Sequence, residues 1–163
     1  MKVDPWQLRQ AMAQFATGVT VVTTIEGSEP RGLTASSFAS LSMAPPLVLV
    51  CLSKRLDAHQ IIESTGIFAV NILSARQVDL GMRFAGLMPE VNDRFEGIDW
   101  TTASTGAPLL PGCLAWVDCR LRNVYEGGDH SIFVGEVQDV GVTDEGEPLL
   151  YHNRLWGRGL FGE

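Results

Sequence analysis

The chain has 163 residues, of which 45% are hydrophobic, and this size and composition predict one domain, residues 1–163, with a sizeable apolar core. Its formal net charge of -7 argues against a broad basic face, so we expect no nucleic-acid partner. No run of about 18 apolar residues and no export signal occurs, so we expect a cytoplasmic protein without a membrane segment.

The first predicted element is a short helix. Asp4 is a residue type that caps free helix amides, and Pro5 fits the first helical position. Apolar residues then recur at helical spacing until Gly18 ends the pattern. We expect this amphipathic helix to pack on the sheet.

The rest of the chain is predicted to be mainly β. Strands are expected at 19–25, 31–38, 47–52, 67–73, 114–125, 131–142 and 148–151, and helices at 57–64 and 75–85. Short turns join the first two of these strands and the two long ones, as in antiparallel hairpins. Antiparallel strands with scattered helices favour a closed or partly split barrel.

One long connection interrupts this pattern. Residues 86–112 are rich in polar residues, Gly and Pro, and we expect a loop there. Loops of this length are uncommon in compact domains and often form binding edges, and residues 92–95 are its expected functional portion.

The chain contains three cysteines, Cys51, Cys113 and Cys119. They cannot all pair with one another, and none has the two-residue spacing of a zinc or redox pair. We therefore expect buried, reduced thiols and no metal site.

The segment from Gly32 to Ser42 carries small hydroxyl residues between two strand-like runs. Thr34, Ser36 and Ser37 offer short donors and accessible backbone, which suits a phosphorylated cofactor with a flat ring, such as a flavin. The same residue types also occur in ordinary turns.

A second candidate segment directly follows the strand at 47–52. Ser53, Lys54 and Arg55 are candidate phosphate ligands, and Asp57 is expected to cap the helix beginning there. Lys54 and Arg55 could equally be solvated loop charges, so this pattern alone does not identify a flavin site.

Along nearly its full length the chain resembles the short-chain flavin reductases of two-component monooxygenases. The motifs that carry the resemblance are RQAMAQFATGVTVVT (9–23), GLTASSF (32–38), PPLVLVCL (45–52), FAVNIL (68–73) and GDHSI (128–132). The resemblance implies a mainly β fold with peripheral helices, an FMN-binding split β-barrel of antiparallel Greek-key type, and a homodimer.

The resemblance also implies an NAD(P)H:flavin oxidoreductase. Such an enzyme transfers hydride from NADH, or alternatively NADPH, to FMN or FAD, and a separate oxygenase component receives the reduced flavin. Two alternatives remain open. One is a non-catalytic flavin-binding or carrier module, and the other is a flavin-dependent reductase of ferric chelates or cobalamin.

The site residues follow from the same resemblance. The implied flavin-binding set is Thr34, Ala35, Ser36, Ser37, Cys51, Leu52, Ser53, Lys54, Arg55, Asp57, Ala58, Arg83 and Phe84. His130 is implied to position the nicotinamide, and Arg154 is carried as a further nucleotide contact. Hydride passes to the flavin, which is itself the electron sink, so no general base is required.

Overall fold

Runs of β-branched and apolar residues form the central sheet of the computed structural model, which describes residues 3–159. The sheet has seven strands in the order β3-β2-β6-β9-β10-β5-β4, and every adjacent pair is antiparallel. The strands are β2 (Thr20–Glu26), β3 (Glu29–Ala35), β4 (Phe38–Met43), β5 (Pro46–Ser53), β6 (Ile67–Ile72), β9 (Ala115–Gly127) and β10 (His130–Val142). The expected fold class, mainly β and antiparallel with peripheral helices, is confirmed.

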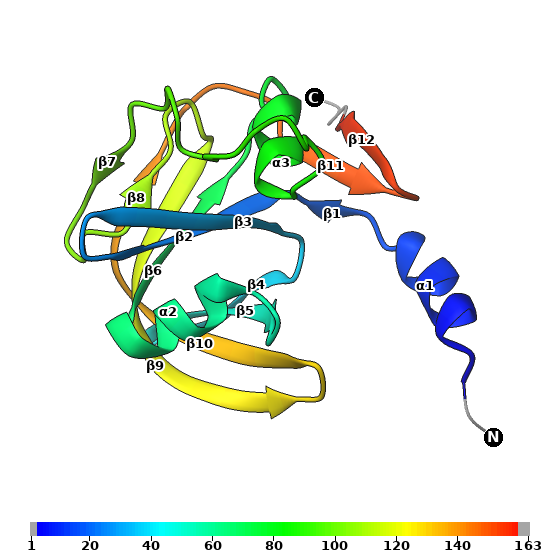
Figure 1. Cartoon of the computed structure of the whole chain (residues 1–163), viewed down its shortest axis with the longest axis horizontal. Helices are drawn as coiled ribbons and strands as arrows, with labels where there is room; N and C mark the ends of the chain where they lie inside the picture. Colours follow the sequence, from blue (N-terminus) through cyan, green and yellow to red (C-terminus); the bar gives the residue numbers. More distant parts are fainter. Residues whose placement is uncertain (1–2, 160–163) are drawn as a thin grey trace.

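The connection between β3 and β4 forces this sheet to curl. These strands are the two edges of the sheet, yet only Ser36 and Ser37 join them. In a flat seven-stranded sheet the edges would lie about 29 Å apart, whereas the link spans at most about 11 Å. The sheet therefore wraps round until its edges approach, as Figure 1 shows, without a hydrogen-bonded ladder between them. This arrangement is a partly open barrel.

Two smaller sheets complete the β structure. One has the order β1-β11-β12 and consists of β1 (Thr17–Gly18), β11 (Leu149–His152) and β12 (Leu155–Arg158). The other pairs β7 (Thr101–Thr102) with β8 (Pro108–Leu109), inside the segment that was expected to be an unstructured loop. Strands β4 and β12 were also not predicted, whereas β11 lies close to the expected final strand.

The three helices are α1 (Pro5–Ala13), α2 (Asp57–Thr65) and α3 (Val78–Phe84). Asp4 caps α1 as predicted, since its carboxylate accepts from the amides of Trp6 and Gln7. The expectation that Asp57 caps α2 is wrong. Leu56 occupies the cap position without a side-chain bond, and Asp57 is the first helical residue, where its negative charge still complements the helix dipole.

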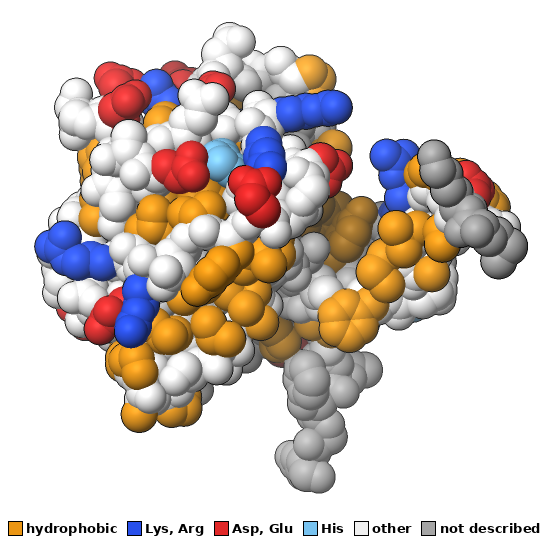
Figure 2. All heavy atoms as spheres, turned by 90° about the horizontal axis from the view of Figure 1, so that it is seen from below, with side chains coloured by type: hydrophobic (Ala, Val, Ile, Leu, Met, Phe, Trp, Pro, Cys, Tyr) orange, Lys and Arg blue, Asp and Glu red, His pale blue; other side chains and the backbone are white. Residues whose placement is uncertain are grey.

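Helix α1 does not pack on the sheet, which corrects a second expectation. None of its residues is buried, and it projects from the barrel (Figures 1 and 2). The apolar side chains of Trp6, Leu8 and Met12 are more than half exposed, as is that of Phe15 just beyond the helix. The periodicity correctly indicated an apolar face, but that face is not buried against the sheet. Neither α1 nor the other two helices is long and apolar enough to cross a bilayer.

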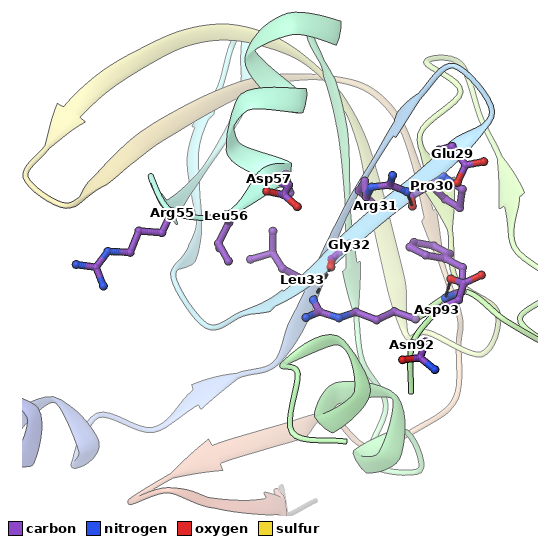
Figure 3. A pocket seen from close by; sticks show the side chains of 13 residues that line it. Glu29, Pro30, Arg31, Gly32, Leu33, Arg55, Leu56, Asp57, Asn92 and Asp93 are labelled. Atoms are coloured by element: carbon purple, nitrogen blue, oxygen red, sulfur yellow. Dashed lines mark hydrogen bonds and ion pairs between the residues drawn. The ribbon is translucent and has the colours of Figure 1, made fainter. Parts of the chain in front are cut away.

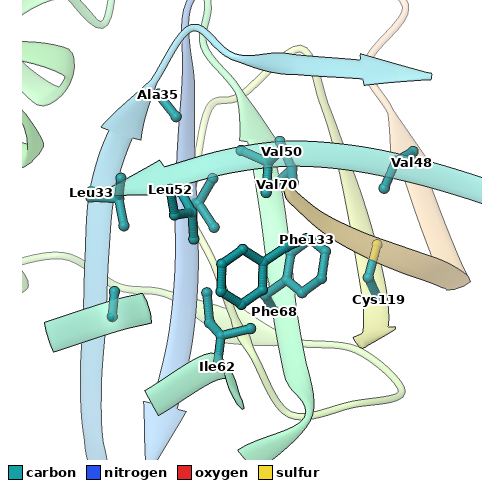
Figure 4. Close-up of a cluster of buried hydrophobic side chains, with 12 residues drawn as sticks. Leu33, Ala35, Val48, Val50, Leu52, Ile62, Phe68, Val70, Cys119 and Phe133 are labelled. Atoms are coloured by element: carbon teal, nitrogen blue, oxygen red, sulfur yellow. The ribbon is translucent and has the colours of Figure 1, made fainter. Parts of the chain in front are cut away.

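The main core fills the inside of the curled sheet. Phe68, Phe133, Val50 and Val70 are fully buried there and converge from three strands, β5, β6 and β10 (Figure 4). Gly135 allows this packing, because a Cβ at that position would lie 2.4 Å from the Phe68 ring. A second cluster, which includes Phe84, Phe95 and Leu149, lies between α3, the 92–98 segment and β11.

Asn71 anchors the segment around β8 to the barrel. Its fully buried side chain donates to the carbonyl oxygen of Val21 and to Thr23 Oγ1, both at 3.1 Å, and accepts from the amide of Leu110 at 2.8 Å. These three bonds satisfy polar groups that water cannot reach.

We expect Asn71→Ala to lower the free energy of unfolding by at least about 2 kcal/mol, because each stranded buried polar group costs about 1 to 3 kcal/mol. Chemical denaturation measures the change. Asn123→Ala is the matched control, since Asn123 lies exposed on β9. Equal stability of the two variants would contradict the anchoring role.

The thiols differ in burial. Cys113 and Cys119 are buried as expected, but Cys51 is only half-buried, because alternate residues of β5 face away from the core. Burial raises the pKa of the Cys113 thiol to about 11, opposed in part by a hydrogen bond with Gln77. Burial and the nearby Asp118 raise the pKa of the Cys119 thiol to about 12.

A pH of 8 lies below the raised pKa values of both buried thiols, so they stay protonated. Only the thiolate form of cysteine reacts with alkylating agents. We therefore expect iodoacetamide to modify one residue, Cys51, in the native protein and all three cysteines after unfolding. Mass spectrometry measures the labelling, and Cys51→Ser should remove the native reaction. Labelling of Cys113 or Cys119 at the rate of Cys51 in the folded protein would refute this assignment.

Candidate functional site

A cleft of about 590 Å³ opens on one flank of the barrel and brings together three separate segments (Figure 3). Residues 29–33 of β3 form one wall, residues 55–58 at the start of α2 form the second, and residues 92–95 form the third. The structure thus places the predicted residues Arg55, Asp57 and Ala58 beside the segment that was expected to be a binding edge.

The floor of the cleft depends on a close approach between β3 and α3. A Cβ on Gly32 would lie 2.7 Å from the Phe84 ring. That ring packs edge-on against Phe95, with 5.0 Å between the ring centroids. Phe84 is only 1% exposed, so its ring fills the space beside Gly32 and supports the floor of the cleft from below.

Two arginines hold the third wall. Arg83 Nη2 donates to the backbone oxygens of Asp93 at 2.8 Å and Glu96 at 2.7 Å, and Arg94 Nη1 donates to those of Gly32 and Phe84, both at 3.1 Å. Charged donors strengthen such bonds. Arg83 Nε is buried and has no hydrogen-bond partner within residues 3–159, so Arg83 both shapes the wall and keeps one donor unused.

The serine-rich connection lies at the end of β3. Thr34 Oγ1 donates to the carbonyl of Gly81 in α3 at 2.6 Å. Ser37 Oγ donates to the Cys51 carbonyl at 2.7 Å and accepts from the Cys51 amide at 3.3 Å. Ala35 is buried in the main core, whereas Ser36 is exposed. The structure therefore joins the predicted residues 34–37 to the end of β5.

A second hollow, of about 460 Å³, lies on the other side of this connection. It is lined by Ser36 and Ser37, by apolar residues at the end of α1, and by Arg154 in the β11–β12 turn. Of the predicted site residues, Arg55, Asp57 and Ala58 line the first hollow. Ser36, Ser37 and Arg154 line the second, and the other predicted residues line neither.

The turn after β5 lies directly against the turn that carries His130. Ser53 pairs with His130 across β5 and β10, and the Lys54 amide donates to the Asp129 carbonyl at 3.1 Å. The Lys54 ammonium pairs with Glu126 at the end of β9. Of the neighbouring predicted residues, Leu52 is buried in the core, and Ser53 Oγ accepts from the Arg55 amide at 3.4 Å. The candidate phosphate turn and the candidate nicotinamide residue are therefore neighbours.

Asp129 orients the exposed imidazole of His130. The two side chains are 2.8 Å apart, from Nδ1 to Oδ1. The hydrogen bond with His130 lowers the pKa of the Asp129 carboxyl. The positive charges of His130 and of the more distant Arg55 lower it further. Asp129 is thus held as the carboxylate that accepts from Nδ1, and His130 Nε2 makes no hydrogen bond to any described residue.

Arg31 and His59 are neighbours of this site that the sequence did not single out. Arg31 lies on β3 two residues before Leu33 and lines the cleft, where it pairs with Glu29 at 3.6 Å. Because side chains alternate between the two faces of a strand, the two-residue spacing could have indicated that Arg31 lies on the same face as Leu33. His59 is buried in α2 and contacts Ser131, next to His130. No sequence pattern indicated this second contact.

The chain is similar to known proteins along most of its length. Residues 12–158 match the flavin reductase like domain. The reductase subunit HsaB of a flavin-dependent monooxygenase from Rhodococcus jostii (strain RHA1) is 43% identical over 150 residues, which cover 92% of this chain and 75% of that protein. An NADH-dependent FAD reductase from Streptomyces globisporus is 47% identical over 136 residues, covering 82% and 74%.

A solved structure supports the same relationship. The Streptomyces globisporus NADH:FAD oxidoreductase SgcE6, in complex with NAD and FAD fragments, superimposes with a TM-score of 0.88 at 41% identity, covering 98% of this chain and 97% of that one. The family match spans most of the chain, and the sequence and fold comparisons agree. The chain therefore belongs to the flavin reductase like domain family.

Proposed function

We propose that this protein is an NAD(P)H:flavin oxidoreductase that transfers hydride from NADH to FAD or FMN and supplies the reduced flavin to a separate monooxygenase component. The observation that carries the proposal is the contact between the Ser53–Arg55 turn and the His130 turn beside an open cleft, in a chain of this family. This contact brings a candidate phosphate site and a candidate nicotinamide site to one end of the barrel.

The residues present fit a flavin. Ser36 and Ser37 are small and exposed, which leaves room for a flat ring near accessible backbone, and the buried Arg83 Nε has no hydrogen-bond partner within residues 3–159. Arg55 and Arg31 supply local cations for phosphate in an otherwise acidic chain. FAD and NADH are the favoured pair, because the similar Streptomyces globisporus protein is named an NADH-dependent FAD reductase.

The work of the protein in this reaction is orientation. When bound, the flavin supplies the ring that accepts the hydride, so the protein needs no general base. Asp129 holds His130 Nδ1 and leaves Nε2 for the nicotinamide side. Placing donor and acceptor atoms about 3 to 3.5 Å apart supplies much of the rate enhancement.

The partner proposal has a parallel among the relatives, since HsaB is named as the reductase subunit of a flavin-dependent monooxygenase. A cytoplasmic location suits the three free cysteines. The competing functions are a flavin carrier that does not react with NADH and a reductase of another acceptor.

The direct test is anaerobic titration with NADH in the presence of FAD and of FMN, recording flavin bleaching and nucleotide oxidation together. We expect stoichiometric bleaching and, in air, continuous NADH oxidation that depends on added flavin. Tight flavin binding without NADH oxidation would favour the carrier. Faster turnover with ferric chelate or cobalamin than with free flavin would favour the other reductase.

His130→Ala should reduce kcat/KM for NADH by about 10-fold or more, since one positioning contact is worth about 1 to 2 kcal/mol. Flavin affinity should change little, because His130 is exposed at the nicotinamide side. His152→Ala is the matched control, since this exposed histidine lies on β11. Unchanged flavin reduction by His130→Ala would remove His130 from the site.

We infer that the protein is a homodimer in which α1 packs against the second copy. Its apolar face, which includes Leu8 and Met12, is more than half exposed in the described chain, and exposing it to water costs free energy roughly in proportion to its area (Figure 2).

Light scattering after gel filtration should give a dimer for the wild-type protein. The double variant Leu8→Glu and Met12→Glu should shift it to monomer, because burying two charges in an apolar contact is strongly unfavourable. Leu87→Glu is the control, since Leu87 is comparably exposed but lies beyond α3. A monomeric wild-type protein would contradict the inference.

A further inference from the structure

His59 is a buried histidine outside the flavin and nicotinamide contact sets. It lies in the first turn of α2 and is 6% exposed. Its Nε2 is 2.9 Å from Ser131 Oγ, and its ring packs edge-on against Phe133 with 4.8 Å between the centroids. Its Nδ1 lies 3.4 Å from a carboxylate oxygen of Glu63. Both ring nitrogens therefore have partners, and the ring is held in one orientation.

The partner of His59 has a special place in the sheet. Ser131 is 1% exposed and directly follows His130 on β10, where it pairs with Leu52 across β5. Asp57 and Ala58, which precede His59, line the cleft. Helix α2 and strand β10 are both fully described, and the His59–Ser131 bond is the single hydrogen bond between side chains of these two elements. It joins the start of the helix to the start of the strand.

The backbone ladder between β5 and β10 ends at the pair of Ser53 with His130, and the links beyond that pair are weaker. The ion pair of Lys54 with Glu126 is largely exposed, and such pairs contribute little in water. The backbone bond from Lys54 to Asp129 lies at the same rim. A buried hydrogen bond between neighbours in a packed core is stronger and less mobile.

We propose that His59 is a positioning residue that fixes the spacing between His130 and residues 55–58, which lie beyond the end of the β5–β10 ladder. This inference rests on the proposed function, in which these two turns hold the flavin and the nicotinamide. Hydride transfer is sensitive to misplacement of about 1 Å, which can cost about 100-fold in rate. A buried tie next to His130 would therefore affect the transfer step more than either binding step.

The test compares Ser131→Ala, His59→Leu, their double variant and His59→Gln, with Ile62→Val as a matched control. Ile62 is fully buried on the same helix but has no part in the bond. Stopped-flow measurement of anaerobic flavin bleaching at saturating NADH gives the transfer rate. Fluorescence titration gives the flavin Kd, and hydrogen exchange reports on residues 53–59 and 128–133.

We expect Ser131→Ala and His59→Leu each to slow hydride transfer by about 10-fold, with flavin Kd within about twofold of wild type. The double variant should be no slower than the slower single variant, because both remove one bond. His59→Gln should recover most of the rate, since its amide can reach the same hydroxyl. Exchange in both turns should rise, while Ile62→Val changes neither rate nor exchange there.

Transfer at the wild-type rate in Ser131→Ala would overturn the inference, even if His59→Leu fails to fold. Slowing by Ile62→Val to the same extent would also overturn it, because the effect would then be general loosening of the helix. A wild-type protein that does not bleach flavin would instead refute the proposed function, and this inference with it.

Discussion

The two-residue connection through Ser36 and Ser37 is the constraint on which the structure depends. It joins strands at opposite edges of a seven-stranded sheet and so requires the sheet to curl into a partly open barrel. The same two residues then lie against the end of β5, where Ser37 bonds both backbone groups of Cys51. The same connection therefore both curls the sheet and assembles the candidate site, because the residues that join its edges also bring β3 close to the end of β5.

Burial and polar contacts have different tasks in this arrangement. The rings of Phe68 and Phe133 lie among the apolar side chains that fill the barrel, and the burial of this cluster stabilises its curvature. The walls of the cleft are instead held by arginine side chains that bond backbone carbonyls, which fixes the 92–96 segment without adding apolar surface. A cleft built in this way stays polar and open at its edge while its floor, the Phe84 and Phe95 pair, remains rigid.

Local chemistry in the sequence predicted most of the strands, because β-branched runs and short Gly-containing turns act within a few residues. It also singled out residues 92–95 within the long connection, and these residues line the cleft. It failed where the outcome depends on what an element meets. The apolar face of α1 was recognised but its partner was not, and β4 was missed because its serines resemble a turn. The sequence contains no periodic pattern that indicates the separation of Arg154 from Arg55, Asp57 and Ala58, or the contact of His59 with Ser131. Both depend on how the curled sheet brings distant segments together.

The charges around the site suit a flavin that leaves. Arg31 pairs with Glu29 and Lys54 with Glu126, so two of the nearby cations already have acidic partners, whereas Arg55 forms no ion pair with the described residues. An anionic ligand must displace or share these carboxylates, which reduces the net gain from each phosphate contact. With a net charge of -7 over the whole chain, long-range attraction for phosphates is weak as well. Under the proposed function, affinity would then rest on shape and short-range contacts around the predicted residues 34–37, and moderate binding suits a reductase that releases its product to another protein.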